Sequence, residues 1–381
     1  MIGVRGLASD PPPAFRSRTT LLVGGAELAA EELSAGLARR GHEIVLYTRG
    51  GQERTDARGF TLRPTPYLAG RGVEAFTHSF TATLSALRGS FDLLHFHAMG
   101  PSGMAVLARM RGRPAVVTVQ GMDWERQKWS AVESKVLHAL GRMGLRWAST
   151  VIAVAPSLEP ALRRLGARRI EVIPNGCSPV SFQTAMPPPP AGLESGRYFL
   201  TMSRLVPEKN IHGVVQAYRD SSPPWPLVIA GGGADTPDYV ADLHEKAHGC
   251  HGIRFVGPVA GKAKEALLRH AGGFVNASFL EGLSLGILEA LGEGVPVAVS
   301  NIAANLDVFA LAPSPPASLR TFAPDDPSGL GAALHALTRL SQDERRDWSV
   351  YARTVRDRFS WDGIAARTET VYRRAVRSRS E

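Results

Sequence analysis

The sequence predicts an α/β protein with two domains, each built around a parallel sheet covered by helices. A length of 381 residues leaves room for two domains of roughly 150–200 residues each. Short apolar runs alternate with amphipathic segments in both halves, which is the pattern of strand–helix–strand units. A proline run at 187–190 separates the halves. We therefore expect domains at 1–186 and 198–358, a linker at 187–197 and a closing segment at 359–381.

Composition excludes several classes of protein. With 44% hydrophobic and 21% charged residues, the chain has ordinary globular composition and not that of a disordered one. It has no signal-like apolar core near the start and no run of about 18 apolar residues, so we expect a cytoplasmic protein without a spanning helix. Cys177 and Cys250 have no metal-ligand spacing, which argues against a disulfide framework and a zinc site.

The net charge of +9 comes almost wholly from scattered arginines. A nucleic-acid-binding protein concentrates such charge on one element, with aromatic residues between the cations, so we expect no nucleic-acid partner. Two interpretations stay open. The charge attracts anionic membranes or phosphate-bearing substrates weakly, or it is a bias of composition without a binding role.

The first domain has an ambiguous start. The first strand is either 2–4, followed by a long Pro- and Arg-rich loop, or 20–23. A helix at 27–40 and a strand at 44–47 then complete a strand–helix–strand unit. Gly24 and Gly25, at the helix start, allow either close approach of a phosphate or acceptor, or simple packing of helix on strand.

Further along the first domain, buried strands are predicted at 91–96, 115–119, 151–155 and 170–173. We expect His95 and His97 to point to opposite faces of their strand and so to share no metal. His97, at the carboxyl end, is the better site candidate. The helix predicted at 133–147 is amphipathic, with Lys135, Arg142 and Arg146 opposite its apolar residues. It is either an ordinary surface helix or a weak peripheral membrane contact.

The second domain opens with a strand at 198–201, directly before Arg204 and Lys209. Open α/β sheets bind ligands at the carboxyl ends of their strands, so both cations are candidate ligand-binding residues. A surface salt bridge to Glu208 is the alternative for Lys209. Strands at 227–230, 253–256 and 296–300 and helices at 211–219, 262–270, 327–340 and 343–358 are also predicted.

The stretch 274–291 is predicted to be strand, loop and helix, with Glu281 in the loop and Glu289 inside the helix. Eight positions of helix place two such carboxylates roughly 10–12 Å apart along the axis, which suits the two ends of an elongated ligand. Between them the backbone amides at 283–286 are free for an anion, and Gly282, Ser284 and Gly286 are small. Otherwise Glu281 is a solvated loop acid and Glu289 a helix-surface acid.

Four segments resemble motifs of retaining glycosyltransferases of family 4. EGLSLGILEALGEGVPV is similar to the E-x7-E segment EGFGLPxLEAMAxGxPV, and SRLVPEKN to GRLxxEKN. VTVQGMDWERQKW resembles the TVHGxDWxRxKW segment of a bacterial subset, and FSWDGIAARTETVYR the family's closing segment. Four positions depart from these motifs. Gly286 stands in place of the usual Pro, Leu283 and Ser284 in place of Phe-Gly, and Gln120 in place of a His.

The resemblance implies the GT-B fold, in which two Rossmann-like domains face each other across a cleft. The first domain would take the acceptor and the second the nucleotide sugar, and the last helix would cross back to the first domain. No metal and no cofactor beyond the nucleoside-diphosphate sugar would be required. By this resemblance Arg204 and Lys209 neutralise the donor diphosphate, helped by the amides of Leu283, Ser284, Leu285 and Gly286.

The resemblance assigns the remaining site residues too. Glu281 would orient donor sugar hydroxyls, Glu289 the ribose, and the backbone at Gly257 the base. On the acceptor side we expect Gln120, which cannot be protonated and so argues against acid–base work, together with Asp123, Trp124 and His97. Loop packing is the alternative for Trp124 and its neighbours.

The sequence has no nucleophile elbow, P-loop, zinc-protease helix or Cys-His signature. A diphosphate cradle supports departure of a nucleoside diphosphate from a sugar. The predicted function is a retaining glycosyltransferase that acts on a hydroxyl of a glycan, a lipid-linked saccharide or a secondary-metabolite core. The alternatives are a sugar-nucleotide epimerase of the same fold and a non-catalytic sugar-nucleotide-binding protein.

Overall fold

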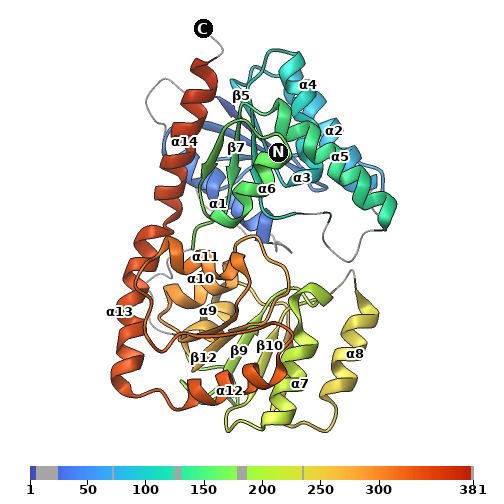
Figure 1. Cartoon of the computed structure of the whole chain (residues 1–381). Helices are drawn as coiled ribbons and strands as arrows, with labels where there is room; N and C mark the ends of the chain where they lie inside the picture. The colour runs from blue at the N-terminus through green and yellow to red at the C-terminus, as the bar shows by residue number, and fades with distance from the viewer. Residues whose placement is uncertain are drawn as a thin grey trace. The chain divides into compact units, whose positions relative to one another are not determined.

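The computed structural model describes residues 1–5, 25–70, 73–122, 124, 130–177, 187–233 and 236–378. The chain divides into two compact α/β units, Met1–Gly176 with Trp361–Glu381, and Cys177–Ser360 (Figure 1). The second unit is therefore inserted into the first. The domain boundary expected at residue 186 lies outside the described residues, and Cys177 already belongs to the second unit.

The second unit is a doubly wound sheet of six parallel strands, ordered β11-β10-β9-β12-β13-β14. In chain order they are β9 (Phe199–Met202), β10 (Leu227–Ala230), β11 (Ile253–Gly257), β12 (Gly273–Asn276), β13 (Val297–Ser300) and β14 (Arg320–Phe322). The order reverses direction between β9 and β12, which are neighbours, so the topological switch point lies there. This arrangement confirms the predicted Rossmann-like sheet.

The helices of this unit cover both faces of the sheet. They are α7 (Ile211–Ser221), α8 (Pro237–Ala247), α9 (Gly261–Arg269), α10 (Leu285–Gly292), α11 (Ala303–Leu311), α12 (Pro327–Thr338) and α13 (Gln342–Arg358). On one face, side chains of α7 and α12 form one core with the strands, among them Val214, Ile229, Val275 and Leu334. Strands buried on both faces read as continuous apolar runs, which is why they were predictable.

The first unit has an eight-stranded sheet with the order β3-β4-β2-β1-β5-β6-β7-β8. Its strands are β1 (Ile2–Arg5), β2 (Glu43–Arg49), β3 (Arg54–Thr55), β4 (Thr61–Thr65), β5 (Leu93–His97), β6 (Ala115–Val119), β7 (Thr150–Ala153) and β8 (Ile170–Val172). β2 is parallel to β4, and β5 to β8 run parallel to one another.

Two strands depart from the parallel sheet that was predicted: the edge strand β3, which is antiparallel to β4, and the central strand β1. Strand β1 is antiparallel to both neighbours, with Ile2 opposite Leu46 and His95. The reversal brings Met1 to the sheet edge where β5 ends, and the Met1 carbonyl accepts a hydrogen bond of 2.9 Å from Tyr47 N. The alternative strand at 20–23 lies outside the described residues.

The helices of the first unit are α1 (Gly25–Arg39), α2 (Val73–Arg88), α3 (Met99–Ser102), α4 (Ala105–Met110), α5 (Ala131–Trp147), α6 (Glu159–Arg164) and α14 (Trp361–Arg377). α14, red in Figure 1, packs on α1 through a buried glutamate. Glu369 accepts hydrogen bonds from Arg40 at 2.5 Å and Arg373 at 2.6 Å, and His42 lies 3.3 Å away.

Within the described ranges, no helix has the length and hydropathy of a membrane span.

The Glu369 cluster predicts a pH-dependent stability. Burial raises the pKa of Glu369, but the hydrogen bonds and charges of Arg373, Arg40 and His42 outweigh it and lower the pKa to about 2, from 4.5 for a free glutamate. Its stabilisation is therefore full above pH 4.5 and is lost as the pH falls towards 2. We expect Glu369→Gln to lower the melting temperature at pH 7, and the deficit to shrink below pH 4.5. Glu245→Gln, on an exposed face of α8, is the control; a deficit of constant size would contradict the prediction.

Candidate active site

The candidate site lies at the switch point of the second unit, where β9 and β12 run side by side. Chains that leave such neighbouring strands go to opposite faces of the sheet and leave a crevice at the carboxyl edge. After β9 the chain carries Arg204 and Lys209, and after β12 it carries Glu281. The backbone ties the two loops together, because Phe279 N donates a 2.9 Å hydrogen bond to Glu208 O.

Lys209 and Glu281 form a buried ion pair across this crevice. The Lys209 Nζ lies 2.6 Å from Glu281 Oε1, and the two side chains are only 15% and 9% exposed. The alternative partner considered for Lys209, Glu208, is therefore wrong. Glu208 instead lies 3.9 Å from the Arg204 guanidinium. Both predicted cations thus stand at one edge of the sheet, each beside an acid.

Glu281 is held as a carboxylate and is not a solvated loop acid. The same oxygen accepts hydrogen bonds from Ser278 Oγ at 2.8 Å and Asn276 Nδ2 at 3.4 Å. Burial acts to raise the pKa of Glu281, but the charge of Lys209 and these hydrogen bonds prevail, so its pKa lies below the usual value. At neutral pH the group is therefore an acceptor of hydrogen bonds.

The helix α10 begins beside this carboxylate. Ser284 is its N-cap, and its Oγ accepts a 3.4 Å hydrogen bond from Ile287 N and one of 3.2 Å from Asn276 Nδ2. The cap uses the Ile287 amide, so the predicted anion-binding amides of Leu283, Ser284, Leu285 and Gly286 precede it. A Cβ on Gly286 would lie 3.1 Å from the Phe274 ring and 3.2 Å from Met202 O. Its small size therefore serves the packing of α10 on β9 and β12.

Glu289, one turn further along α10, is also paired. Its Oε1 lies 2.5 Å from Nζ of Lys264 on α9, and the glutamate side chain is 10% exposed. It is thus not the solvated surface acid of the alternative interpretation. Gly257, expected to contact the base, ends β11 with φ of +71°, a conformation that favours glycine, and its carbonyl accepts a hydrogen bond from Gly231 N.

The histidines of the first unit correct one expectation. His95 and His97 lie on the same face of β5, with ring centroids 4.2 Å apart, because strand side chains repeat every two residues. His95 bonds to the Tyr372 hydroxyl at 2.6 Å and to Thr118 Oγ1 at 2.7 Å, so its role is structural. Neither ring nitrogen of His97 has a hydrogen-bond partner within the described chain. Burial and the amino terminus lower the pKa of His97 to about 3, so it is neutral.

The other acceptor-side candidates are engaged in packing. Gln120, after β6, exchanges two amide hydrogen bonds with Asn175, at 3.0 and 2.9 Å. Trp124 packs edge-on against His138 of α5, and its carbonyl accepts a bond from Ser134. This contact is the packing alternative for Trp124. Gly25 begins α1, while Gly24 and Asp123 lie outside the described residues.

Two residues of the site, Asn276 and Lys264, were not predicted from the sequence. Asn276 ends β12 and donates to both Glu281 and Ser284, and its own Oδ1 accepts from Asn305 at 3.2 Å and from Ser278 N. Lys264 neutralises Glu289. A polar residue at the end of an apolar strand was the available signal for Asn276. Elsewhere, the part of the chain that is described holds no group of three or more His, Cys, Asp or Glu side chains fit for a metal.

Comparisons with known proteins extend over both units. Residues 23–180 match the model of Glycosyltransferase Family 4, and residues 188–355 that of Glycosyl transferases group 1. Glycogen synthase of Mycobacterium tuberculosis is 26% identical, over 94% of this chain and 92% of the relative. Two solved structures are similar over most of the chain. Sucrose-phosphate synthase of Thermosynechococcus elongatus has a TM-score of 0.76 at 19% identity over 93% of this chain and 94% of that one. Anabaena HepE, in complex with UDP-glucose, has 0.72 at 18% identity over 93% and 97%.

The two sheets, the charged switch point and these matches define a glycosyltransferase with the GT-B fold. Together the two family matches span most of the chain. More narrowly, residues 23–180 are similar to Glycosyltransferase Family 4 and residues 188–355 to Glycosyl transferases group 1.

The position of Asn276 predicts the effect of one added charge. In Asn276→Asp a second carboxylate replaces the donor beside Glu281, which raises the pKa of Glu281 and removes one of the two hydrogen bonds that Ser284 Oγ accepts. We expect a loss of about 1–3 kcal/mol in the free energy of unfolding at pH 7, and a smaller loss at pH 4, where protonation relieves the repulsion. Chemical denaturation at both pH values measures it. Asn301→Asp, at an exposed position, should change little; equal losses in both variants would refute the assignment.

Proposed function

We propose that this glycosyltransferase takes its sugar from a nucleoside-diphosphate sugar bound at the switch point of the second unit. One observation carries the proposal: the loops after β9 and β12 bring Arg204, Lys209 and Glu281 to one crevice, with the start of α10 beside them. The Anabaena protein of the same fold was solved with UDP-glucose, which supports a donor of this class.

In this proposal Lys209 bridges the donor and the enzyme. An ammonium group has three N–H donors, and the Glu281 carboxylate uses one of them. The remaining donors, with Arg204 and the amides at 283–286, stabilise the charge that grows on the leaving diphosphate as the bond to the sugar breaks. Glu281 stays anionic, which leaves its second oxygen to accept hydrogen bonds from sugar hydroxyls.

One turn into α10, Glu289 binds the ribose hydroxyls, and Lys264 acts as its positioning residue. The Gly257 backbone contacts the base. The hydroxyl nearest to Glu281, that of Ser278, is buried and donates to this carboxylate, so we favour retention without a covalent intermediate, through attack on the face that the diphosphate leaves. The departing phosphate takes the proton of the acceptor hydroxyl. The acceptor is a hydroxyl of a glycan, a lipid-linked saccharide or a secondary-metabolite core.

The two acids should respond differently to substitution. We expect Glu281→Gln mainly to lower kcat, because the contact to the reacting sugar is altered, by about 10- to 100-fold. Glu289→Ala should mainly raise the KM for the donor, because ribose binding is equal in the ground and transition states. Steady-state kinetics with the donor varied measures both. Glu245→Gln, exposed on α8, is the matched control. Wild-type kinetics in both variants would contradict the assignment of Glu281 and Glu289 to the donor site.

Donor binding is tested without knowledge of the acceptor. We expect one class among UDP, GDP, dTDP and ADP sugars to raise the melting temperature. At a donor concentration of one hundred times Kd, binding adds about 2.7 kcal/mol to the free energy of unfolding. Arg204→Ala should abolish the shift, whereas Lys246→Ala, an exposed lysine paired with Asp242, should retain it. Product mass with and without acceptor distinguishes transfer from epimerisation. If no donor raises the melting temperature of the wild type, or if the Arg204→Ala variant shows the full rise, the donor site lies elsewhere.

A further inference from the structure

The helix α5 has two faces that are both apolar, and only one of them is buried. Its start is fixed by a capping box between Ser130 and Glu133. The inner face packs on α3 through glycines: a Cβ on Gly144 would lie 2.3 Å from Ser102 O, and one on Gly141 2.7 Å from Met99 Cε. Such close approach leaves the helix no freedom to rotate about its axis. The opposite face is therefore fixed to point outward.

The outward face of α5 carries a stripe of apolar side chains. Val132 is 72% exposed, Val136 53%, Met143 39% and Trp147 48%, and Ala139 between them is also exposed. Their spacings of four, three, four and four residues place them within about 80° of one another around the helix. Single exposed apolar side chains are common on protein surfaces, but a stripe along a whole helix marks an interaction surface.

Cations flank this stripe on one side. Lys135, Arg142 and Arg146 are exposed and have no ion-pair partner in the described part of the chain. The one acid of α5, Glu133, is used in the capping box. The outer face is thus apolar in its centre and cationic at its edge, as in helices that lie in the headgroup region of a bilayer.

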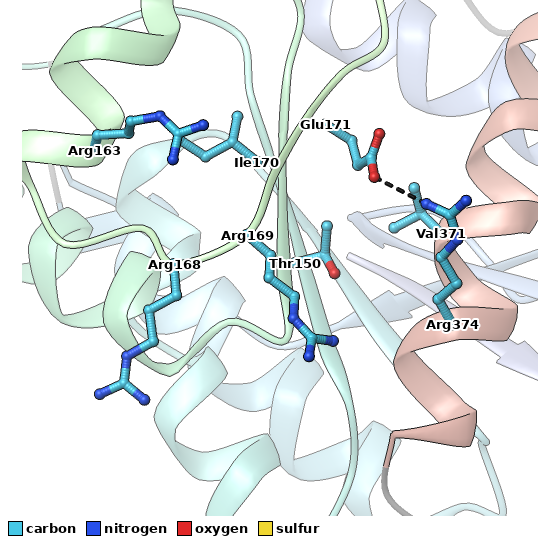
Figure 2. Close-up of a pocket in the computed structure, with 8 residues that line it drawn as sticks. All are labelled: Thr150, Arg163, Arg168, Arg169, Ile170, Glu171, Val371 and Arg374. Atoms are coloured by element: carbon cyan, nitrogen blue, oxygen red, sulfur yellow. Dashed lines mark hydrogen bonds and ion pairs between the residues drawn. The ribbon is translucent and has the colours of Figure 1, made fainter.

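The cationic edge continues into a pocket of four arginines. The Arg146 side chain lies over Gly166, whose added Cβ would be 2.8 Å from Arg146 Cγ, and Arg168 and Arg169 follow in the chain. Figure 2 shows the pocket, of about 390 Å³, lined by Thr150, Arg163, Arg168, Arg169, Ile170, Glu171, Val371 and Arg374. Arg163 is paired with Glu159 and Arg374 with Glu171. Arg168 and Arg169 have no acidic partner in the described residues, so their charge is available to an anion.

Charge decides between the possible occupants. A second copy whose α5 packed antiparallel on the stripe would bring Lys135, Arg142 and Arg146 beside their own counterparts, and the repulsion would oppose that dimer. A nucleic acid offers no apolar phase for Val136, Met143 and Trp147. A bilayer that is apolar inside and anionic at its surface satisfies both the stripe and its cationic edge.

We propose that α5 and the arginine pocket together form the surface by which this protein docks on an anionic phospholipid bilayer. The stripe of Val132, Val136, Ala139, Met143 and Trp147 enters the acyl boundary. Lys135, Arg142 and Arg146 contact lipid phosphates along the helix, and Arg168 and Arg169 hold a further phosphate at its end. The docking surface is independent of the sugar-transfer chemistry proposed above.

Sedimentation of the full chain with lipid vesicles tests the proposal. We expect binding to vesicles of phosphatidylcholine mixed with phosphatidylglycerol, little binding to phosphatidylcholine alone, and a fall in binding as salt rises. Each cation near an anionic surface contributes about five-fold in affinity, so Lys135→Glu/Arg142→Glu should weaken binding by about 25-fold or more. Arg168→Ala/Arg169→Ala should weaken it by about 25-fold.

The double variant Val136→Asp/Met143→Asp tests the contribution of the apolar stripe. It should abolish binding even to anionic vesicles. Val350→Asp, at a site 60% exposed on α13, and Arg353→Glu, also exposed there, are the matched controls and should bind as the wild type does. Melting curves confirm that each variant is folded. Equal binding by wild type and α5 variants, equal binding to neutral vesicles, or a wild-type dimer in sedimentation velocity that Met143→Asp abolishes would each overturn the proposal.

Discussion

The ion pair between Lys209 and Glu281 is the contact on which the order of the candidate site depends. It joins the loop after β9 to the loop after β12, at the only place in the second sheet where the strand order reverses. Removing one partner of a buried pair leaves the other charge uncompensated, which costs more than the pair itself contributes. The oxygen that Lys209 contacts also accepts from Ser278 and Asn276, so the pair fixes the position of the α10 N-terminus as well.

Every charge at this site already has a partner. Lys209 is beside Glu281, Arg204 is near Glu208, and Lys264 is on Glu289. Neutral pairs keep the crevice ordered without a ligand, and each acid reduces the repulsion among the three cations. A diphosphate that enters such a site does not have to order flexible side chains, so less of its binding energy is lost to conformational entropy.

Much of this structure could be predicted from the sequence, because the sheet strands are runs of buried apolar residues and the helices have clear ends. The family motifs placed Arg204, Lys209, Glu281 and Glu289 near their observed elements. Partners were harder to predict, since Lys209 pairs with Glu281, 72 positions away, and not with adjacent Glu208. Strand direction was not predictable either. The run at the start of the chain is apolar in both directions, and only the register with Leu46 and His95 reveals that β1 is reversed.

Surface features were the least predictable. The sequence marked α5 as amphipathic, but its buried face proved to be built on glycines, which periodicity of large apolar residues does not detect. Orientation was also predicted wrongly at His95 and His97. These histidines are two positions apart and were assigned to opposite faces of their strand, although strand side chains two positions apart share a face. In both cases the composition of the segment was clear and its orientation was not.

The insertion of the second unit into the first has a consequence for synthesis on the ribosome. The sheet of the first unit has all its strands by Val172, yet α14, which supplies Glu369 and Tyr372 to it, is made last. Chains grow from the amino terminus, so Cys177–Ser360 can complete its fold while the first unit still exposes the surface reserved for α14. The apolar face of the nascent first unit therefore stays exposed until about 200 further residues have been synthesised. A chaperone would bind the chain during that interval.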